Sequence, residues 1–363
     1  MRTCLSWENA KASGTAVGAL GARCWYTFVP YVPSSAPPLV IDMHGYGASP
    51  QAQSTMSGWK ELATKHGFVL AYPEGRISNE NSRGWDAGKC CGTYAQSRPM
   101  NGSDDVLFLR GLIKQEIQQH GINPARVYLT GHSNGCAMAQ YMAARSSDII
   151  SAVACFSHYL LVEPKNYDPV PVWFSHGDVD KVVRYSSPGV DCNITTGCSA
   201  LEANHSAFVQ DAAINFERWA KMNECDGKVE VQDFYTHVVF SLNNCSHGAS
   251  VVHVELRGVG HIPYYGYESG VDTTEMAWDF VKSFETARSR LAPWLSTVPP
   301  PLRRSPPPPP RPPPPPPRAP ALQALAPGDR PLLPPAATSF ALPARAPRAL
   351  TAAATLAAAA SAL

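Results

Sequence analysis

Short runs of β-branched and aromatic residues alternate with longer segments of helical period along most of this 363-residue chain. Such alternation is typical of a parallel sheet whose strands are joined by crossover helices. The run at 149–156 is almost wholly apolar, as in a strand covered on both faces. We therefore predict an α/β fold with a doubly wound, mostly parallel sheet. The expected strands are residues 24–29, 39–43, 68–72, 126–129, 149–156, 170–174 and 251–256, and the expected helices are residues 54–66, 134–145, 206–221, 273–287 and one that begins at residue 103.

The amino-acid composition changes near residue 296. Residues 306–317 are prolines interrupted only by Arg311, and residues 350–363 are almost all Ala, Thr and Leu. A proline run favours the extended polyproline II helix, which acts as a semi-rigid spacer. We predict one folded domain at 20–290, large enough to bury a core of its own, and a disordered, Pro- and Ala-rich tail at 296–363.

The formal net charge of +1 gives no reason to expect nucleic acid or an anionic membrane as a partner. We find no apolar segment of membrane-spanning length, and we expect neither a cofactor nor a metal. The adjacent carboxylates Asp104 and Asp105 fall in the first turn of a predicted helix. Negative side chains there cap free backbone amides and favour the helix dipole, so we interpret both as capping residues.

The chain has ten cysteines, an even number without the paired spacing of a zinc site. Disulfides in an oxidising compartment are the better explanation. Connectivity cannot be read from sequence, so several pairs stay open. The candidate pairs are Cys4 with Cys24, Cys91 with Cys136, Cys192 with Cys198, and Cys225 with Cys245.

Four N-x-S/T sequons also indicate an extracellular protein. They lie at Asn101, Asn193, Asn204 and Asn244. Residues 1–22 contain no apolar run long enough for a signal-peptide core. We therefore expect secretion, with a truncated start in the given sequence.

The segment Gly131–Gly135 reads G-H-S-N-G and lies between a predicted strand and a predicted helix. A G-x-S-x-G segment in that context forms a tight turn that holds its serine in a strained backbone conformation. The turn also places Ser133 at a helix N-terminus, where the dipole favours a developing negative charge. We predict that Ser133 is a nucleophile.

A serine hydroxyl needs a base, and the base needs an acid that orients it. In this fold the chain order is nucleophile, acid, base. His261 follows two nearby glycines at the end of a predicted strand, whereas His176 lies at a strand edge and is interpreted as structural. Asp180 is preferred to Asp178 as the acid because it lies farther along its loop, and Asp178 is expected to cap the turn.

The oxyanion of the reaction needs backbone donors aimed at it. One is expected to be the amide of Asn134, directly after the nucleophile. The other is expected to be the amide of Tyr46, in the glycine-rich turn His44–Gly47 after an early strand. His44 itself is interpreted as a structural residue of that turn.

These segments together resemble the polyhydroxybutyrate-depolymerase-like and feruloyl-esterase-B-like family, which consists of secreted carbohydrate esterases of the α/β-hydrolase fold. The matching segments are His44–Gly47, Tyr72–Gly75, Gly84–Gly92, Asp104–Val106, Gly131–Gly135, His176–Asp180 and Gly260–His261. The resemblance covers roughly residues 20 to 287. It implies the α/β-hydrolase fold and, at the acid position, Asp180.

The resemblance implies a secreted serine carboxylic-ester hydrolase, specifically a feruloyl esterase that acts on cell-wall polysaccharide esters through an acyl-enzyme. Polyhydroxybutyrate depolymerase and acetylxylan esterase are the alternatives. Trp85 and Tyr94 are the candidates for stacking on an aromatic acyl group of the substrate, and packing in the core or in a loop is the alternative explanation for both. An alternative of another class is a non-catalytic, wall-associated binding protein anchored by its polyproline tail. The intact order of Ser133, Asp180 and His261 argues against it.

Overall fold

The computed structural model describes residues 1–5, 23–31, 33, 35–88, 90–91, 103–162, 164, 166–187, 192–198 and 211–298. All of the described residues belong to one unit by their backbone contacts. Only the first three residues of the predicted tail are described, and Tyr94 lies outside the described residues. No helix among the described residues has the length and apolar character needed to cross a membrane.

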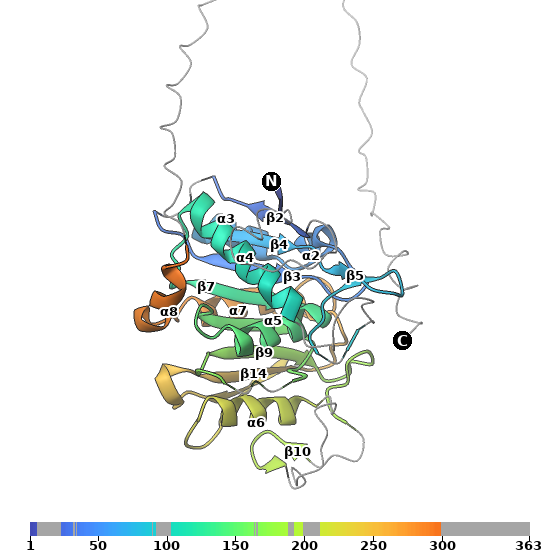
Figure 1. The fold of residues 1–363 in the computed structure, drawn as a ribbon. Helices are drawn as coiled ribbons and strands as arrows, with labels where there is room; N and C mark the ends of the chain where they lie inside the picture. Colours follow the sequence, from blue (N-terminus) through green and yellow to red (C-terminus); the bar gives the residue numbers. More distant parts are fainter. Residues whose placement is uncertain are drawn as a thin grey trace, which may run out of the picture. The chain divides into compact units, whose positions relative to one another are not determined.

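A ten-stranded sheet runs through the molecule in the order β1-β2-β4-β3-β7-β8-β9-β14-β13-β12 (Figure 1). The strands are β1 (Arg2–Leu5), β2 (Arg23–Phe28), β3 (Leu39–Met43), β4 (Val69–Pro73), β7 (Val127–Gly131), β8 (Ala152–Phe156), β9 (Val172–Gly177), β12 (Glu230–Asp233), β13 (His237–Leu242) and β14 (Val251–Leu256). The strands from β4 to β14 in this order pair in parallel, and the remaining pairs at both edges are antiparallel. The predicted mostly parallel sheet is confirmed.

Helices cover both faces of this sheet (Figure 1). The helices are α2 (Pro50–Met56), α3 (Trp59–His66), α4 (Ser103–His120), α5 (Asn134–Arg145), α6 (Ala212–Met222), α7 (Thr273–Val281) and α8 (Arg288–Leu295), with a short 3-10 turn at Ser246–Gly248. Side chains of α4, α5, α6 and α8 belong to one apolar cluster, and those of α3 and α7 belong to a second. Alternate residues of β3 supply the two clusters, with Ile41 in the first and Val40 in the second. The sheet is therefore doubly wound.

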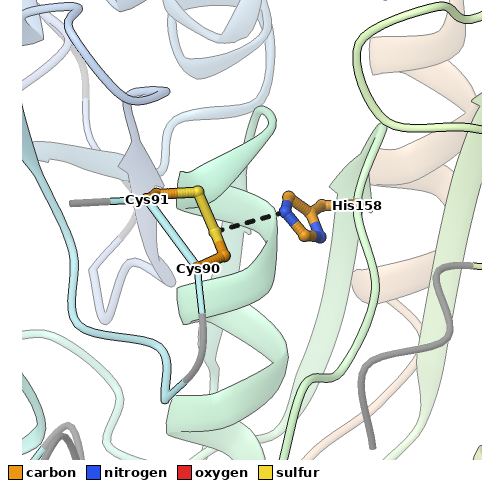
Figure 2. A group of neighbouring side chains, drawn as sticks. All are labelled: Cys90, Cys91 and His158. Atoms are coloured by element: carbon orange, nitrogen blue, oxygen red, sulfur yellow. Dashed lines mark hydrogen bonds between the residues drawn. A yellow bond between two sulfur atoms is a disulfide. The ribbon is translucent and has the colours of Figure 1, made fainter. Parts of the chain in front are cut away.

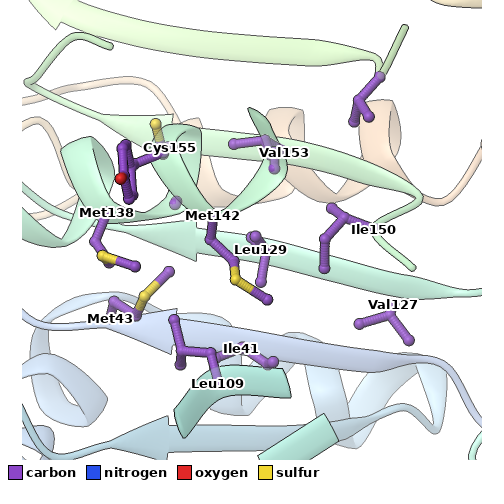
Figure 3. Packing of buried hydrophobic residues seen from close by; sticks show 14 of the residues in the cluster. Ile41, Met43, Leu109, Val127, Leu129, Met138, Met142, Ile150, Val153 and Cys155 are labelled. Carbon is purple, nitrogen blue, oxygen red and sulfur yellow. The ribbon is translucent and has the colours of Figure 1, made fainter. Parts of the chain in front are cut away.

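The packing of α5 on the sheet fixes the turn that precedes this helix. Met138 and Met142 lie over Leu129 of β7 and Ile41 of β3 (Figure 3), and all four side chains are fully buried. Burying a large apolar side chain contributes about 1.5–3 kcal/mol. The helix that follows Ser133 is therefore held firmly against the strands that precede and flank it.

Two short sheets lie in the loops that the structure describes. The first pairs β5 (Arg76–Ile77) with β6 (Arg83–Gly84), and the second pairs β10 (Cys192–Asn193) with β11 (Gly197–Cys198). The first of these sheets belongs to the long loop after β4. Trp85 follows it directly and lies beside the end of β3, where its indole donates a hydrogen bond to the His44 carbonyl.

The predicted single helix at 54–66 is wrong, because the segment forms two helices, α2 and α3. Gly58 adopts a positive φ of 71° between them, a conformation that few residues other than glycine tolerate. The Ser57 carbonyl next to it accepts a hydrogen bond from Thr274 of α7 at 2.7 Å. The predicted end at Gly67 is confirmed.

A buried carboxylate anchors the two short helices to β3. Asp42 accepts hydrogen bonds from Gln53 Nε2 at 2.8 Å and from Ser57 Oγ at 2.7 Å. Burial raises the pKa of Asp42 to about 7, although the hydrogen bonds from Ser57 and Gln53 oppose the rise. These bonds explain why the chain turns at Ser57 instead of continuing as one helix.

The folded region extends beyond the predicted limits of 20 and 290. Strand β1 pairs with β2 in the order Arg2↔Tyr26 to Leu5↔Arg23. At the other end, α8 buries Leu291 and Trp294 in the same core as α5. A four-residue strand gives no measurable period, and the proline inside α8 argues against a helix, so neither element was expected from sequence.

Two of the candidate disulfides are confirmed, those of Cys4 with Cys24 and of Cys225 with Cys245. The latter closes the hairpin of β12 and β13. Cys192 lies opposite Cys198 in the β10–β11 ladder, and the bond between them stays a prediction.

The pair of Cys91 with Cys136 is wrong. Cys91 is bonded to its neighbour Cys90, and Cys136 is bonded to Cys155. Cys136 lies on the face of α5 that packs against β8, and its Cα is 5.0 Å from that of Cys155. The Cys136 side chain points from α5 into the core and not toward the loop that carries Cys91.

Replacing Gly177 with Ala is expected to destabilise the fold by about 1–3 kcal/mol, as overpacking does. A Cβ at Gly177 would lie 2.0 Å from the Val259 carbonyl oxygen, so the loops after β9 and β14 would have to move apart. Denaturant-induced unfolding measures the loss. Gly270→Ala is the matched control, because nothing lies within 4 Å of its added Cβ. Equal stability of the two variants would contradict the close approach.

Candidate active site

Ser133 lies in the turn between β7 and α5 with a positive φ of 53°. A non-glycine residue in this region is strained and persists only where its surroundings hold it. The Ser133 amide donates to the Phe156 carbonyl at 2.8 Å. A Cβ on Gly135 would lie 2.1 Å from the Met43 carbonyl oxygen, so the turn requires glycine there. The segment thus has the strand-turn-helix geometry expected of a nucleophile elbow.

Asp180 and His261 lie on loops that follow the neighbouring parallel strands β9 and β14. His261 Nδ1 is 2.7 Å from Asp180 Oδ2. The Asp180 side chain is fully buried, whereas that of His261 is partly exposed. The structure therefore brings the predicted acid and the predicted base together. Asp178 instead accepts a hydrogen bond from the Gly258 amide at 2.7 Å, which fits a turn-capping residue.

The Asp180 carboxylate has donors on both oxygens. Oδ1 accepts from the amides of Val182 and Val183 at 2.8 and 3.0 Å. Oδ2 faces His261 and also His176 Nε2, at 3.1 Å. Burial alone would raise the pKa of Asp180, but the hydrogen bonds from His176 and His261 outweigh it, and the net pKa lies below its usual range. Asp180 is therefore held as an ionised acceptor behind His261.

His132 joins the elbow to the loop that carries His261. Its Nε2 donates to the His261 carbonyl at 2.6 Å, and the two rings are 4.8 Å apart. Burial, followed by the charge of nearby His261, lowers the pKa of His132 to about 3, so its ring is neutral near neutral pH. His261 is thereby held beside the residue that precedes Ser133. Among the described residues, no hydrogen bond joins Ser133 Oγ to the His261 ring.

The glycine-rich turn after β3 passes close to the nucleophile. A Cβ on Gly45 would lie 3.4 Å from Ser133 Cβ. His44 is buried and accepts from the Gly75 amide at 3.0 Å, which agrees with its predicted structural role. In the part of the chain that the structure describes, the amides of Tyr46 and Asn134 have no hydrogen-bond acceptor. Among the described residues both amides are thus unpaired, one directly after Ser133 and the other directly after Gly45.

The Trp85 side chain is fully buried in this structure, so it exposes no ring face for the predicted stacking on substrate. Its indole donates to the His44 carbonyl at 2.9 Å. Its backbone exchanges two hydrogen bonds with the Asn134 side chain, at 2.7 and 3.0 Å. Trp85 thus fixes the early glycine-rich turn and the elbow to the same loop. Burial of an indole cannot be read from one motif.

Asp105 is likewise not the capping residue that was predicted. It is fully buried and accepts from Arg23 Nη2 at 2.7 Å and from the Asp86 amide at 2.9 Å. The Arg23 guanidinium also lies 4.2 Å from the Phe108 ring centroid. This ion pair supports the loop that contains Trp85.

Sequence reasoning assigned no site role to four further side chains, those of His132, His176, Tyr265 and Tyr267. His132 and His176 contact His261 and Asp180 as described above. Tyr265 and Tyr267 follow His261 and are 64% and 53% exposed. The only sequence signal for the tyrosines was their position directly after Gly260-His261.

Replacing Asp180 with Asn is expected to lower the free energy of unfolding near neutral pH. A carboxylate whose folded-state pKa is depressed below its ordinary value of 3.8 contributes stability above that value, and the contribution is lost as the pH falls through the folded-state pKa. The difference between wild type and variant should therefore shrink on acidification below about pH 4. Guanidinium unfolding over a pH series measures it.

The control for that series is Asp178→Asn, which removes a carboxylate from the same loop with one amide partner. Its free energy of unfolding should differ less from that of the wild type than the value for Asp180→Asn does. If the difference in unfolding free energy between the wild type and Asp180→Asn stays constant down to acid pH, the carboxylate is not stabilised by its donors.

Comparison with known proteins agrees with this geometry. The family described as Esterase PHB depolymerase matches residues 26–166. A feruloyl esterase B from Piromyces equi is 28% identical over 255 residues, which are 69% of this chain and 42% of that protein. A bifunctional acetylxylan esterase/xylanase from Neocallimastix patriciarum is 25% identical over 264 residues, 70% of this chain and 32% of that protein.

A poly(3-hydroxyalkanoate) depolymerase C from Paucimonas lemoignei is 31% identical over 127 residues, 34% of this chain and 29% of that protein. The chain thus spans less than half the length of each of these relatives. The family match begins within β2 and contains β3, the elbow at Ser133 and α5. The resemblance to the family described as Esterase PHB depolymerase is thus confirmed over residues 26–166.

Proposed function

We propose that this chain is a serine carboxylic-ester hydrolase with Ser133 as nucleophile, His261 as base and Asp180 as acid. The observation that supports it most is the 2.7 Å contact of His261 with the buried Asp180, beside a serine in an elbow turn. Nucleophilic catalysis by serine needs this set of groups. The acidic partner is ionised, so it fixes the imidazole tautomer with the proton on Nδ1.

The reaction is a two-step acyl transfer. His261 Nε2 takes the hydroxyl proton as Ser133 Oγ attacks the ester carbonyl, and the amides of Tyr46 and Asn134 stabilise the oxyanion. The alcohol leaves with the proton from His261. Water then attacks the acyl-enzyme with His261 again as the base, which restores the free serine.

The proposed substrate is a feruloyl ester on cell-wall polysaccharide, and the proposed location is extracellular. The similarity to feruloyl esterase B supports the substrate, and Tyr265 and Tyr267, which follow His261 in the sequence, offer exposed aromatic rings. The disulfides support an oxidising compartment. In this proposal the polyproline segment at 306–317 serves to associate the enzyme with the wall.

Replacing Ser133 with Ala is expected to lower the hydrolysis of 4-nitrophenyl acetate by at least about a thousandfold, because the nucleophile is lost. Circular dichroism and thermal unfolding check that the variant is folded. The control is Ser283→Ala, at the end of α7, which should retain full activity. Undiminished hydrolysis by Ser133→Ala would rule out Ser133 as the nucleophile. A wild-type protein without activity would favour the alternative of a non-catalytic binding protein.

The specific substrate is tested by comparing kcat/KM on methyl ferulate, acetylated xylan and hydroxybutyrate oligomers. We expect methyl ferulate to be the best substrate, because its aromatic acyl group can stack on the tyrosines next to His261. A preference for acetylated xylan or for the oligomers would identify the chain as an acetylxylan esterase or a polyester depolymerase. That result would leave the serine mechanism intact.

A further inference from the structure

A disulfide between adjacent residues lies beside the candidate active site. Cys90 and Cys91 are bonded to each other, and both are only partly buried (Figure 2). Cys90 Sγ is 3.6 Å from Nδ2 of Asn134, the residue that follows the nucleophile, and 3.4 Å from His158 Nε2. The same sulfur therefore faces two nitrogen donors of the protein.

The proton of His158 is assigned by its backbone contact. His158 Nδ1 accepts a hydrogen bond from the Tyr159 amide at 2.8 Å, and an amide can only donate. The neutral ring therefore carries its proton on Nε2, the nitrogen that points at Cys90 (Figure 2). The ring is 1% exposed, and burial lowers the pKa of His158 to about 3, so the ring is neutral.

This tautomer argues against the metal site that two cysteines and a histidine would otherwise suggest. The three ligand-type atoms lie within 4.8 Å of one another. A metal bound at Nε2 would require the proton on Nδ1, where it would meet the Tyr159 amide proton. Nε2 is suited to donate a hydrogen bond to sulfur and not to coordinate a cation.

A hydrogen-bond donor that faces a disulfide stabilises one particular product of its cleavage. A disulfide sulfur is a weak acceptor, whereas a thiolate is charged and accepts strongly. The better leaving group in thiol–disulfide exchange is the sulfur whose thiolate is better stabilised. We propose that Cys90–Cys91 is a thiol–disulfide exchange site for a small monothiol, opened by attack on Cys91 with Cys90 as the leaving sulfur.

The exchange balances as follows. A thiolate forms a bond to Cys91 Sγ, the Cys90–Cys91 bond breaks, and its electron pair goes to Cys90 Sγ, which accepts the hydrogen bond from His158. A second thiolate attacks the external sulfur of the mixed disulfide and releases Cys91 as a thiolate. The protein disulfide gains two electrons, the two small thiols become one disulfide, and water protonates the protein sulfurs.

The Cys225–Cys245 disulfide provides an internal control, because both of its residues are also partly buried. Cys245 Sγ lies 3.5 Å from the Leu242 carbonyl oxygen. The partial negative charge of this oxygen would destabilise a thiolate on Cys245. Its residues are separated by 20 positions in sequence, against 1 for Cys90–Cys91. Closing the longer loop removes more entropy from the open chain, which favours the closed bond.

The test treats the full chain with glutathione, stops the reaction with N-ethylmaleimide at short times and maps the modified cysteines by mass spectrometry. We expect glutathione on Cys91 and N-ethylmaleimide on Cys90, before any opening of Cys225–Cys245. Glutathione on Cys90, or earlier opening of Cys225–Cys245, would overturn the proposal. The measurement does not use ester hydrolysis, so its result is independent of the proposed function.

A variant tests the role of His158. His158→Phe keeps a ring but removes the donor, and we expect opening of Cys90–Cys91 to slow by about tenfold while that of Cys225–Cys245 is unchanged. An unchanged rate at Cys90–Cys91 would refute the part assigned to His158. If the variant does not fold, both disulfides will react faster, and the mapping in the wild type still decides the order and direction of attack.

Discussion

The close approach of the Met43 carbonyl to the turn around Ser133 is the contact on which the candidate site depends. A Cβ on Gly131 or Gly135 would lie 2.7 or 2.1 Å from this oxygen, so the end of β3 and the start of α5 can meet only where the turn has glycines. The contact places the glycine-rich turn after β3 next to Ser133, and the amides of Tyr46 and Asn134 have no acceptor among the described residues. Buried Trp85 then fixes both segments to one loop.

Features that depend on local pattern could be predicted from the sequence. The helix predicted at 134–145 has the same bounds as α5, and the strand that precedes it differs from β7 by one or two residues. The order of Ser133, Asp180 and His261 sufficed to pair the acid with the base, because β9 and β14 are parallel neighbours and their carboxyl ends share one edge of the sheet. Their catalytic roles stay a prediction.

Features that depend on tertiary contacts could not be predicted. Nothing in the local sequence shows that Trp85 is buried under the glycine-rich turn, or that Cys136 faces β8. The break at Gly58 is stabilised by Asp42, which is distant in sequence and lies in another element. Strand β1 pairs with β2 across residues 6–22, so its partner is not visible in a short window of sequence.

The four disulfides whose two sulfurs the structure describes are all local, with sequence separations of 20, 1, 19 and 20. None of them connects the segments that carry Ser133, Asp180 and His261. Assembly of those segments therefore depends on non-local strand pairing, which is the slow part of folding for sheets of this kind. Each of these four bonds closes a short stretch of chain, and the meeting of the three side chains rests on the sheet itself.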